Sequence, residues 1–145
     1  MAVARVTPAC PCGRLNAAKK PLTLADCCAR YLDDFAARPA PDAESLMRSR
    51  YSAFALGRAD YLLATWHASQ RPAELTLEAG IQWLGLELRR HRLQDDCHAQ
   101  VEFVARYRVG GRAPSTGSGQ AVRLHELSRF VREDGRWYYV DGDQK

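Results

Sequence analysis

The hydrophobic pattern of the sequence changes its period once, near Ile81, and this change limits the fold more than any other feature. Before it, apolar residues recur every three to four positions in segments 42–57 and 60–67, which predicts two amphipathic helices. After it, apolar and polar residues alternate, which predicts strands over 81–88, 101–107, 122–131 and 137–140. Helices first and strands afterwards indicate an α+β domain in which helices cover one face of an antiparallel sheet.

Punctuating residues mark the boundaries of these segments. Asp42 is placed to cap the first helix and Gly57 to end it. Asp134-Gly135 predicts a tight hairpin between the last two strands. The prolines in 38–41 predict a linker, and the glycine-rich and serine-rich segment 110–119 predicts a flexible connector.

Length and composition exclude several classes of protein. A chain of 145 residues corresponds to one domain with a small appendage. With 46% apolar and 26% charged residues it is typical of a soluble globule. No run approaches the roughly 20 apolar residues of a membrane span, and residues 1–8 lack the apolar stretch of a secretory signal. We therefore expect a cytoplasmic protein without a membrane span.

Charge along the chain gives two further expectations. The run Arg89-Arg90-His91-Arg92 and the tail 141–145 carry charges and breakers that protect strand edges from pairing with other molecules. The same run, together with Arg106, Arg108 and Arg112, is a candidate basic patch for ribosomal RNA or an acidic partner. The net charge of +4 is too small to indicate nucleic-acid binding otherwise.

Four of the five cysteines lie near the N-terminus, as Cys10-Pro11-Cys12-Gly13 and Cys27-Cys28. In a reducing compartment such close pairs predict a metal site with four thiolate ligands, which suits zinc first and iron second. A site filled by four protein ligands is structural, because no position stays open for substrate. Buried thiols and a redox site are the alternatives, whereas Cys97 is predicted to be an incidental thiol.

These cysteines resemble the SEC-C motif, the zinc-binding knuckle at the C-terminus of the SecA export ATPase. The rest of the chain resembles the YchJ family of uncharacterised bacterial proteins. This resemblance rests on five runs of residues: 46–54, 61–67, 101–105, 126–131 and 137–142. It implies a SEC-C-like metal-binding segment over 1–38 and a nuclear transport factor 2-like (cystatin-like) domain over 39–145, a cone of helices on a curved antiparallel sheet.

The resemblance has two departures. The loop from Cys12 to Cys27 is longer than in the usual knuckle, and it starts with Arg14-Leu15-Asn16-Ala17 instead of Gly-Ser-Gly-Lys. Metal binding should tolerate the longer loop, because loop length costs little entropy. A partner that reads the surface of the usual loop need not bind this one.

Cones of this superfamily often hold a pocket at the open end, so aromatic and polar residues of the body are candidate pocket residues. They are Tyr51, Asp60, Tyr61, Trp66, His67, Trp83, Glu102, Glu126 and Arg129. Trp66 is equally explained as a core residue, and His67 as a partner of a helix dipole. Glu126 shares its strand face with apolar residues, which predicts an inward carboxylate paired with Arg48 or Arg50.

No nucleophile and base pair stands out, so no catalytic residue is predicted. The leading hypothesis is a non-enzymatic docking or adaptor protein whose knuckle binds a protein partner of the export machinery or the ribosome. One alternative is a small-molecule-binding protein or acid-base enzyme that uses the cone, and another is an iron or redox sensor. Cones of this kind often dimerise through the sheet, so a homodimer is a further candidate assembly.

Overall fold

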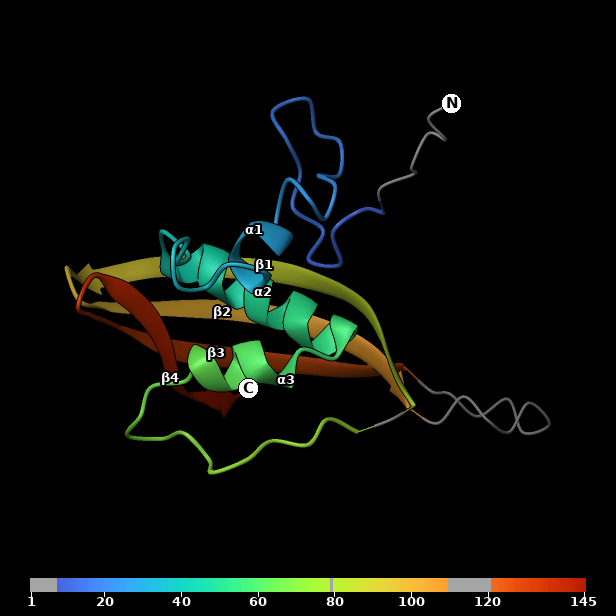
Figure 1. Cartoon of the computed structure of the whole chain (residues 1–145). Helices are drawn as coiled ribbons and strands as arrows, with labels where there is room; N and C mark the ends of the chain where they lie inside the picture. Colours follow the sequence, from blue (N-terminus) through green and yellow to red (C-terminus); the bar gives the residue numbers. More distant parts are fainter. Residues whose placement is uncertain (1–7, 79, 110–120) are drawn as a thin grey trace.

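The computed structural model describes residues 8–78, 80–109 and 121–145, so the first seven residues and the predicted connector 110–119 lie outside the described part. Helices come first along the chain and strands follow, as predicted (Figure 1). The elements are α1 (Ala29–Leu32), α2 (Ala43–Leu56), α3 (Ala59–Ala64), β1 (Ile81–Asp95), β2 (His98–Val109), β3 (Ala121–Glu133) and β4 (Arg136–Gln144).

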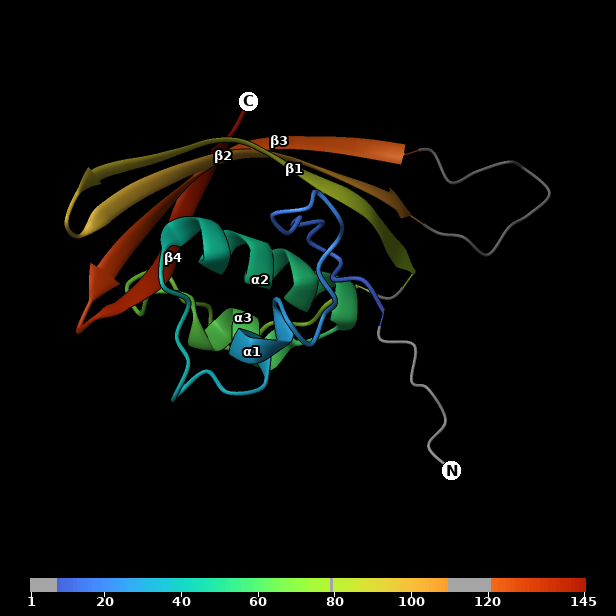
Figure 2. The ribbon, with the colours of Figure 1, turned by 90° about the horizontal axis from the view of Figure 1, so that it is seen from above.

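The four strands form one antiparallel sheet in the order β1-β2-β3-β4. Shifts of register interrupt β1 at three places and the β3–β4 pair at one. Such bulges bend strands and increase their twist. Figure 2 shows the resulting sheet curving over the helices, all of which lie on its concave side. The α+β architecture with helices on one face of the sheet is therefore confirmed.

Helix α2 is the central element, between the sheet and the shorter helices α1 and α3 (Figure 2). Its ends are those predicted: the side chain of Asp42 accepts a hydrogen bond from Ser45 N at 2.7 Å, and Gly57 ends the helix in the left-handed region with φ 75°. Because it is covered on both sides, α2 buries Ser49, Arg50 and Ser52 as well as its apolar stripe.

The second helix is shorter than predicted, because α3 ends at Ala64 instead of reaching His67. The hydroxyl of Thr65 donates to the carbonyl of Tyr61, and the chain then pairs with β4. His67 N donates to Tyr139 O at 2.7 Å, and Tyr139 N donates to Thr65 O at 2.8 Å. The hairpin turn is as predicted, with Asp134 and Gly135 both at positive φ.

Two strands extend further than predicted, into the charged segments that were expected to protect strand edges. Strand β1 includes 89–92, and β4 includes the charged residues up to Gln144. Both segments lie on the two edge strands of the sheet, and in β4 the charges pair across to the neighbouring strand. Arg129 of β3 lies 2.6 Å from Asp141 and 2.8 Å from Asp143 of β4.

Several residues of the candidate basic patch lie beside carboxylates. Within β1, Arg89 forms an ion pair with Glu87 at 2.6 Å, and the same carboxylate lies 3.9 Å from Arg106 of β2. His91 is 4.0 Å from Glu44 of α2. Arg112 lies outside the described residues. The carboxylates therefore offset part of the positive charge that the sequence places here.

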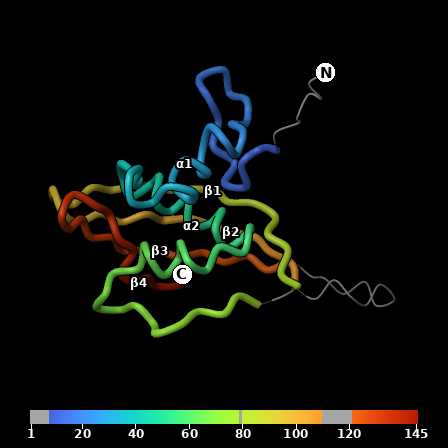
Figure 3. The backbone as a smooth tube through the Cα atoms, viewed as in Figure 1, coloured from blue at the N-terminus to red at the C-terminus, as the bar shows by residue number. Residues whose placement is uncertain are grey.

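One hydrophobic cluster joins the N-terminal cysteines, α2 and the inner face of the sheet. The segment around residues 13–21 stands out from the helices as a loop, drawn in blue in Figure 3. No helix in the described part of the chain has the length and apolar character required to cross a bilayer.

Candidate functional site

The four N-terminal cysteines come together as one buried cluster. Their side chains are 0–4% exposed, and the four sulfur atoms lie within 4.8 Å of one another. Cys97 stays apart from them and is exposed in the turn between β1 and β2. The structure therefore brings together the four cysteines that the sequence singled out, and no others among the described residues.

Short local structures position these sulfur atoms. Gly13 N donates to Cys10 O at 3.2 Å, which closes a turn with Pro11 and Cys12 at its centre, and Gly13 takes φ 75° to leave this turn. Cys10 N donates to Leu22 O at 2.9 Å, so the two arms of the loop lie side by side. Cys27 and Cys28 come immediately before α1 and reach the cluster from the other side.

The spacing of the sulfur atoms fits a tetrahedral metal ion. The distance from Sγ of Cys12 is 3.5 Å to that of Cys10 and 3.6 Å to that of Cys27, and the Cys27–Cys28 distance is 4.0 Å. Four sulfur atoms at about 2.3 Å from a central zinc ion would be about 3.8 Å apart. The donor set and its geometry can therefore hold one metal ion of this class.

Four thiols at these distances ionise unequally. The hydrogen bond with Cys12 lowers the pKa of Cys10, whereas hydrogen bonds with Cys10 raise the pKa of Cys27 and of Cys28. Complete ionisation places four like charges within 4.8 Å, so it requires a cation among them.

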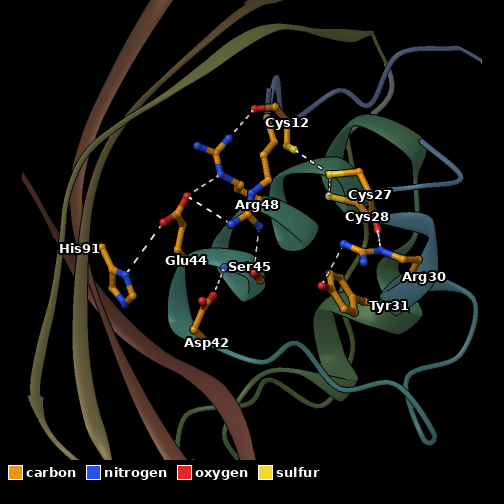
Figure 4. Close-up of polar contacts among 11 residues, drawn as sticks. Cys12, Cys27, Cys28, Arg30, Tyr31, Asp42, Glu44, Ser45, Arg48 and His91 are labelled. Carbon is orange, nitrogen blue, oxygen red and sulfur yellow. Dashed lines mark hydrogen bonds and ion pairs between the residues drawn. The ribbon is translucent and has the colours of Figure 1, made fainter. Parts of the chain in front are cut away.

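Helix α2 holds the cluster directly, as Figure 4 shows. Arg48 Nη1 donates to Cys12 O at 3.1 Å, and its Nε donates to Glu44 at 3.0 Å. Arg14 Nη1 donates to Ser45 Oγ at 2.9 Å. Cys10 Sγ and Ser52 Oγ are 3.4 Å apart. The cysteine segment is thus bonded directly to α2 through Ser45, Arg48 and Ser52.

Four of the nine candidate pocket residues line one cavity of about 340 Å³ between α2 and the sheet: Tyr51, Trp66, Trp83 and Glu126. The structure brings these four together from α2, the segment after α3, β1 and β3. Burial raises the pKa of Tyr51 to about 12, so its hydroxyl keeps its proton at neutral pH.

The three other candidates from the helical region lie elsewhere. Asp60 is exposed, and its carboxylate accepts a hydrogen bond from Arg58 at 3.1 Å. Tyr61 is a core residue whose hydroxyl is 2.8 Å from Ser49 Oγ. His67 Nε2 lies 2.7 Å from a carboxylate oxygen of Glu133, outside the cavity.

The two remaining candidates face away from the helices, on the outer side of the sheet. Glu102 lies 2.6 Å from His125 Nε2, and this hydrogen bond lowers the pKa of Glu102. Arg129 binds the carboxylates of β4 described above, which raise its pKa. Any role of these five residues in a ligand site would be separate from the cavity.

The arginines near Glu126 are arranged differently from the prediction. Arg48 contacts the cysteine segment, and among the described residues no ion pair within 4.0 Å joins Glu126 to Arg48 or Arg50. Arg50 lines the cavity, a role that the sequence analysis missed. Arg50 lies on the same helix stripe as Met47 and Tyr51, but this position did not predict a place in the cavity, because an arginine at a helix surface usually extends into solvent.

The model of the family described as "YchJ, middle NTF2-like domain" matches residues 42–142, from the cap of α2 into β4. The chain belongs to the YchJ family. A UPF0225 protein from Polaromonas sp. is 67% identical over 94% of this chain and 93% of its own length. Another UPF0225 protein, from Bordetella parapertussis, is 56% identical over 93% of this chain and 92% of its own length.

Two solved structures resemble this YchJ-family fold over most of its length. A SEC-C motif containing protein from Rhodopseudomonas palustris is 32% identical, with a TM-score of 0.73 over 93% of this chain and 97% of the other. A SEC-C motif containing protein from Psychrobacter arcticus is 35% identical, with a TM-score of 0.72 over 92% of this chain and 80% of the other. The family match confirms the NTF2-like fold, and the two solved structures support the presence of a SEC-C motif in this chain.

Proposed function

We propose that this protein is a cytoplasmic, non-enzymatic docking protein whose four cysteines hold one zinc ion. The observation that carries the proposal is the spacing of the four buried sulfur atoms at 3.5–4.0 Å along three of their pairs. Zinc with four protein ligands has no open position for a substrate, so its role here is to fix the fold of the loop that surrounds it.

The surface that this metal would fix is the loop 13–21 (Figure 3). Leu15 is 53% exposed at its start, and the side chains of Lys19 and Lys20 are exposed at its end. An exposed leucine beside two lysines suits an acidic protein surface with an apolar contact at its centre. The SEC-C resemblance leads us to place that partner in the export machinery or on the ribosome.

The metal is tested first, by elemental analysis of untagged protein purified without added metal. We expect about one equivalent of zinc, strongly reduced in Cys27→Ser and unchanged in the matched control Cys97→Ser. Protein purified anaerobically should be colourless. Iron with visible absorbance would overturn the zinc assignment and favour the iron or redox sensor.

The docking role is tested with a photo-reactive amino acid introduced at the exposed Ala17. We expect a cross-link in cells to a ribosomal protein or an export component, lost when Leu15→Asp is added. Leu93→Asp is the control, because Leu93 is 60% exposed on β1, outside the loop. A cross-link that survives Leu15→Asp, or none to either machinery, would refute this role.

A further inference from the structure

The cavity between α2 and the sheet has walls that are mostly aromatic. Trp83 of β1 is the centre of this wall, with ring centroids 5.4 Å from Tyr51, 5.6 Å from Phe54 and 5.2 Å from Tyr107. Its volume of about 340 Å³ is within the range of cavities that bind small organic molecules. These rings are inclined to that of Trp83 by 44–78°, so they offer both faces and edges to the ring of a flat apolar ligand.

Arg50 places a buried positive charge at this cavity. Its side chain is 4% exposed, its Nη1 donates to Leu62 O at 2.8 Å and Thr65 Oγ1 at 2.7 Å, and its guanidinium lies 4.5 Å from the ring centroid of Tyr139. Within the described part of the chain, no group accepts a hydrogen bond from its Nε or Nη2, and no carboxylate lies within 4.0 Å.

Those two nitrogens are not completely buried, because no fully buried side-chain nitrogen or oxygen of the described residues lacks a partner. Arg50 lines the cavity, so we infer that Nε and Nη2 are open to it. Burial lowers the pKa of Arg50 to about 10, so the guanidinium still carries its charge at neutral pH. A buried cation with free donors is stabilised by an anion that accepts from them.

Glu126 supplies the opposite charge in the same cavity. One oxygen, Oε2, accepts a hydrogen bond from Ser128 Oγ at 2.8 Å. Oε2 also lies against Gly142 of β4, where a Cβ atom would collide with it. The other oxygen, Oε1, has no partner among the described residues. The carboxylate is thus held on one side and left free to accept a hydrogen bond on the other.

We propose that this cavity binds a small zwitterion with a flat apolar body, the chemistry of an aromatic amino acid. The ligand carboxylate accepts from Nε and Nη2 of Arg50, its ammonium group donates to Glu126, and its ring packs against Trp83. No ion pair within 4.0 Å joins Arg50 and Glu126 among the described residues, so each charge remains available to a ligand group of opposite sign. This site is separate from the metal centre and does not depend on the proposed docking role.

The test titrates the full-length, metal-loaded protein, isotopically labelled, with L-tryptophan, indole-3-acetate and tryptamine. Indole-3-acetate lacks the ammonium group and tryptamine lacks the carboxylate, so the two compounds probe Glu126 and Arg50 separately. We expect saturable shifts of amide signals from α2 and β1 with L-tryptophan, and affinities about tenfold weaker with either analogue, because each loses a charged hydrogen bond.

Glu126→Gln tests the carboxylate without changing the shape of the side chain. We expect the affinity for L-tryptophan to fall about tenfold, and the affinity for indole-3-acetate to be no lower than that of the wild type. Glu102→Gln is the matched control, since Glu102 is on the neighbouring strand and the opposite face of the sheet. It should change neither affinity.

Three results would overturn the proposal. The first is the absence of shifts at the cavity with any of the three compounds at millimolar concentration. The second is an analogue, tryptamine or indole-3-acetate, that binds as tightly as L-tryptophan. That result would mean that the charged group missing from the analogue does not contribute to binding. The third is a Glu126→Gln variant that binds L-tryptophan as tightly as the wild type.

Discussion

Replacing Arg48 by Met should destabilise the whole domain, because Arg48 ties the cysteine segment to α2. Its side chain is 16% exposed, so solvent weakens its interactions little. Arg48→Met deletes the hydrogen bond to Cys12 O and the ion pair with Glu44. Glu44 keeps Arg14 at 3.9 Å, so the larger loss is at the carbonyl of Cys12.

The magnitude follows from the type of bond. A hydrogen bond from a charged donor contributes about 1.5–3 kcal/mol, and methionine retains most of the apolar stem of arginine. We expect the free energy of unfolding to fall by about 2 kcal/mol. For a chain of this size that corresponds to a decrease in Tm of about 4–8 °C.

The assay is urea denaturation and thermal melting of the metal-loaded protein, followed by circular dichroism. Arg89→Met is the matched control, since Arg89 also bonds a glutamate on its own element, at 2.6 Å, but is 42% exposed. An exposed pair contributes about 0–1 kcal/mol. If Arg48→Met is as mild as Arg89→Met, the cysteine segment is not energetically coupled to α2 and the reasoning fails.

Two further changes test the sheet. Gly142→Ala should lower the free energy of unfolding by about 1–3 kcal/mol, because the new methyl group collides with Glu126, whereas Gly85→Ala meets nothing within 4 Å and should cost under about 1 kcal/mol in urea denaturation. His125 lowers the pKa of Glu102, so this pair stabilises the fold above the ordinary glutamate pKa of 4.5 and stops doing so as the pH falls through the lowered value. The melting temperature of Glu102→Gln should therefore lie below that of the wild type at pH 7, and the difference should shrink as the pH falls below 4.5. A constant difference would contradict the assignment.

The cysteine cluster shows how far sequence reasoning reaches into the site. The two cysteines of each close pair lie within one short turn, and the conformation of that turn determines where each sulfur atom lies. The four cysteines that the sequence grouped together therefore lie together in the structure. The cavity was predicted less well, since only four of its residues were among the nine candidates and Arg50 was not one of them.

Features that depend on neighbours within a few residues could be predicted from the amino-acid sequence. Asp42 and Gly57 bound α2, and Asp134 and Gly135 form the hairpin, because capping and turn conformations are local properties of the backbone. The change from helical to alternating period determined the order of helices and strands for a similar reason: each element buries one face, and its period records that face.

The partners of the polar residues depend instead on the packing of distant segments. Arg48 and Arg50 are two positions apart on α2, so they project to different sides, one toward Cys12 and the other toward Tyr139 near the end of the chain. The charged residues at the end of β4 remain part of the sheet because Arg129 of β3 lies opposite Asp141 and Asp143 and pairs with both. Such pairings connect residues far apart in the sequence, so they exist only once the chain has folded and no local pattern records them.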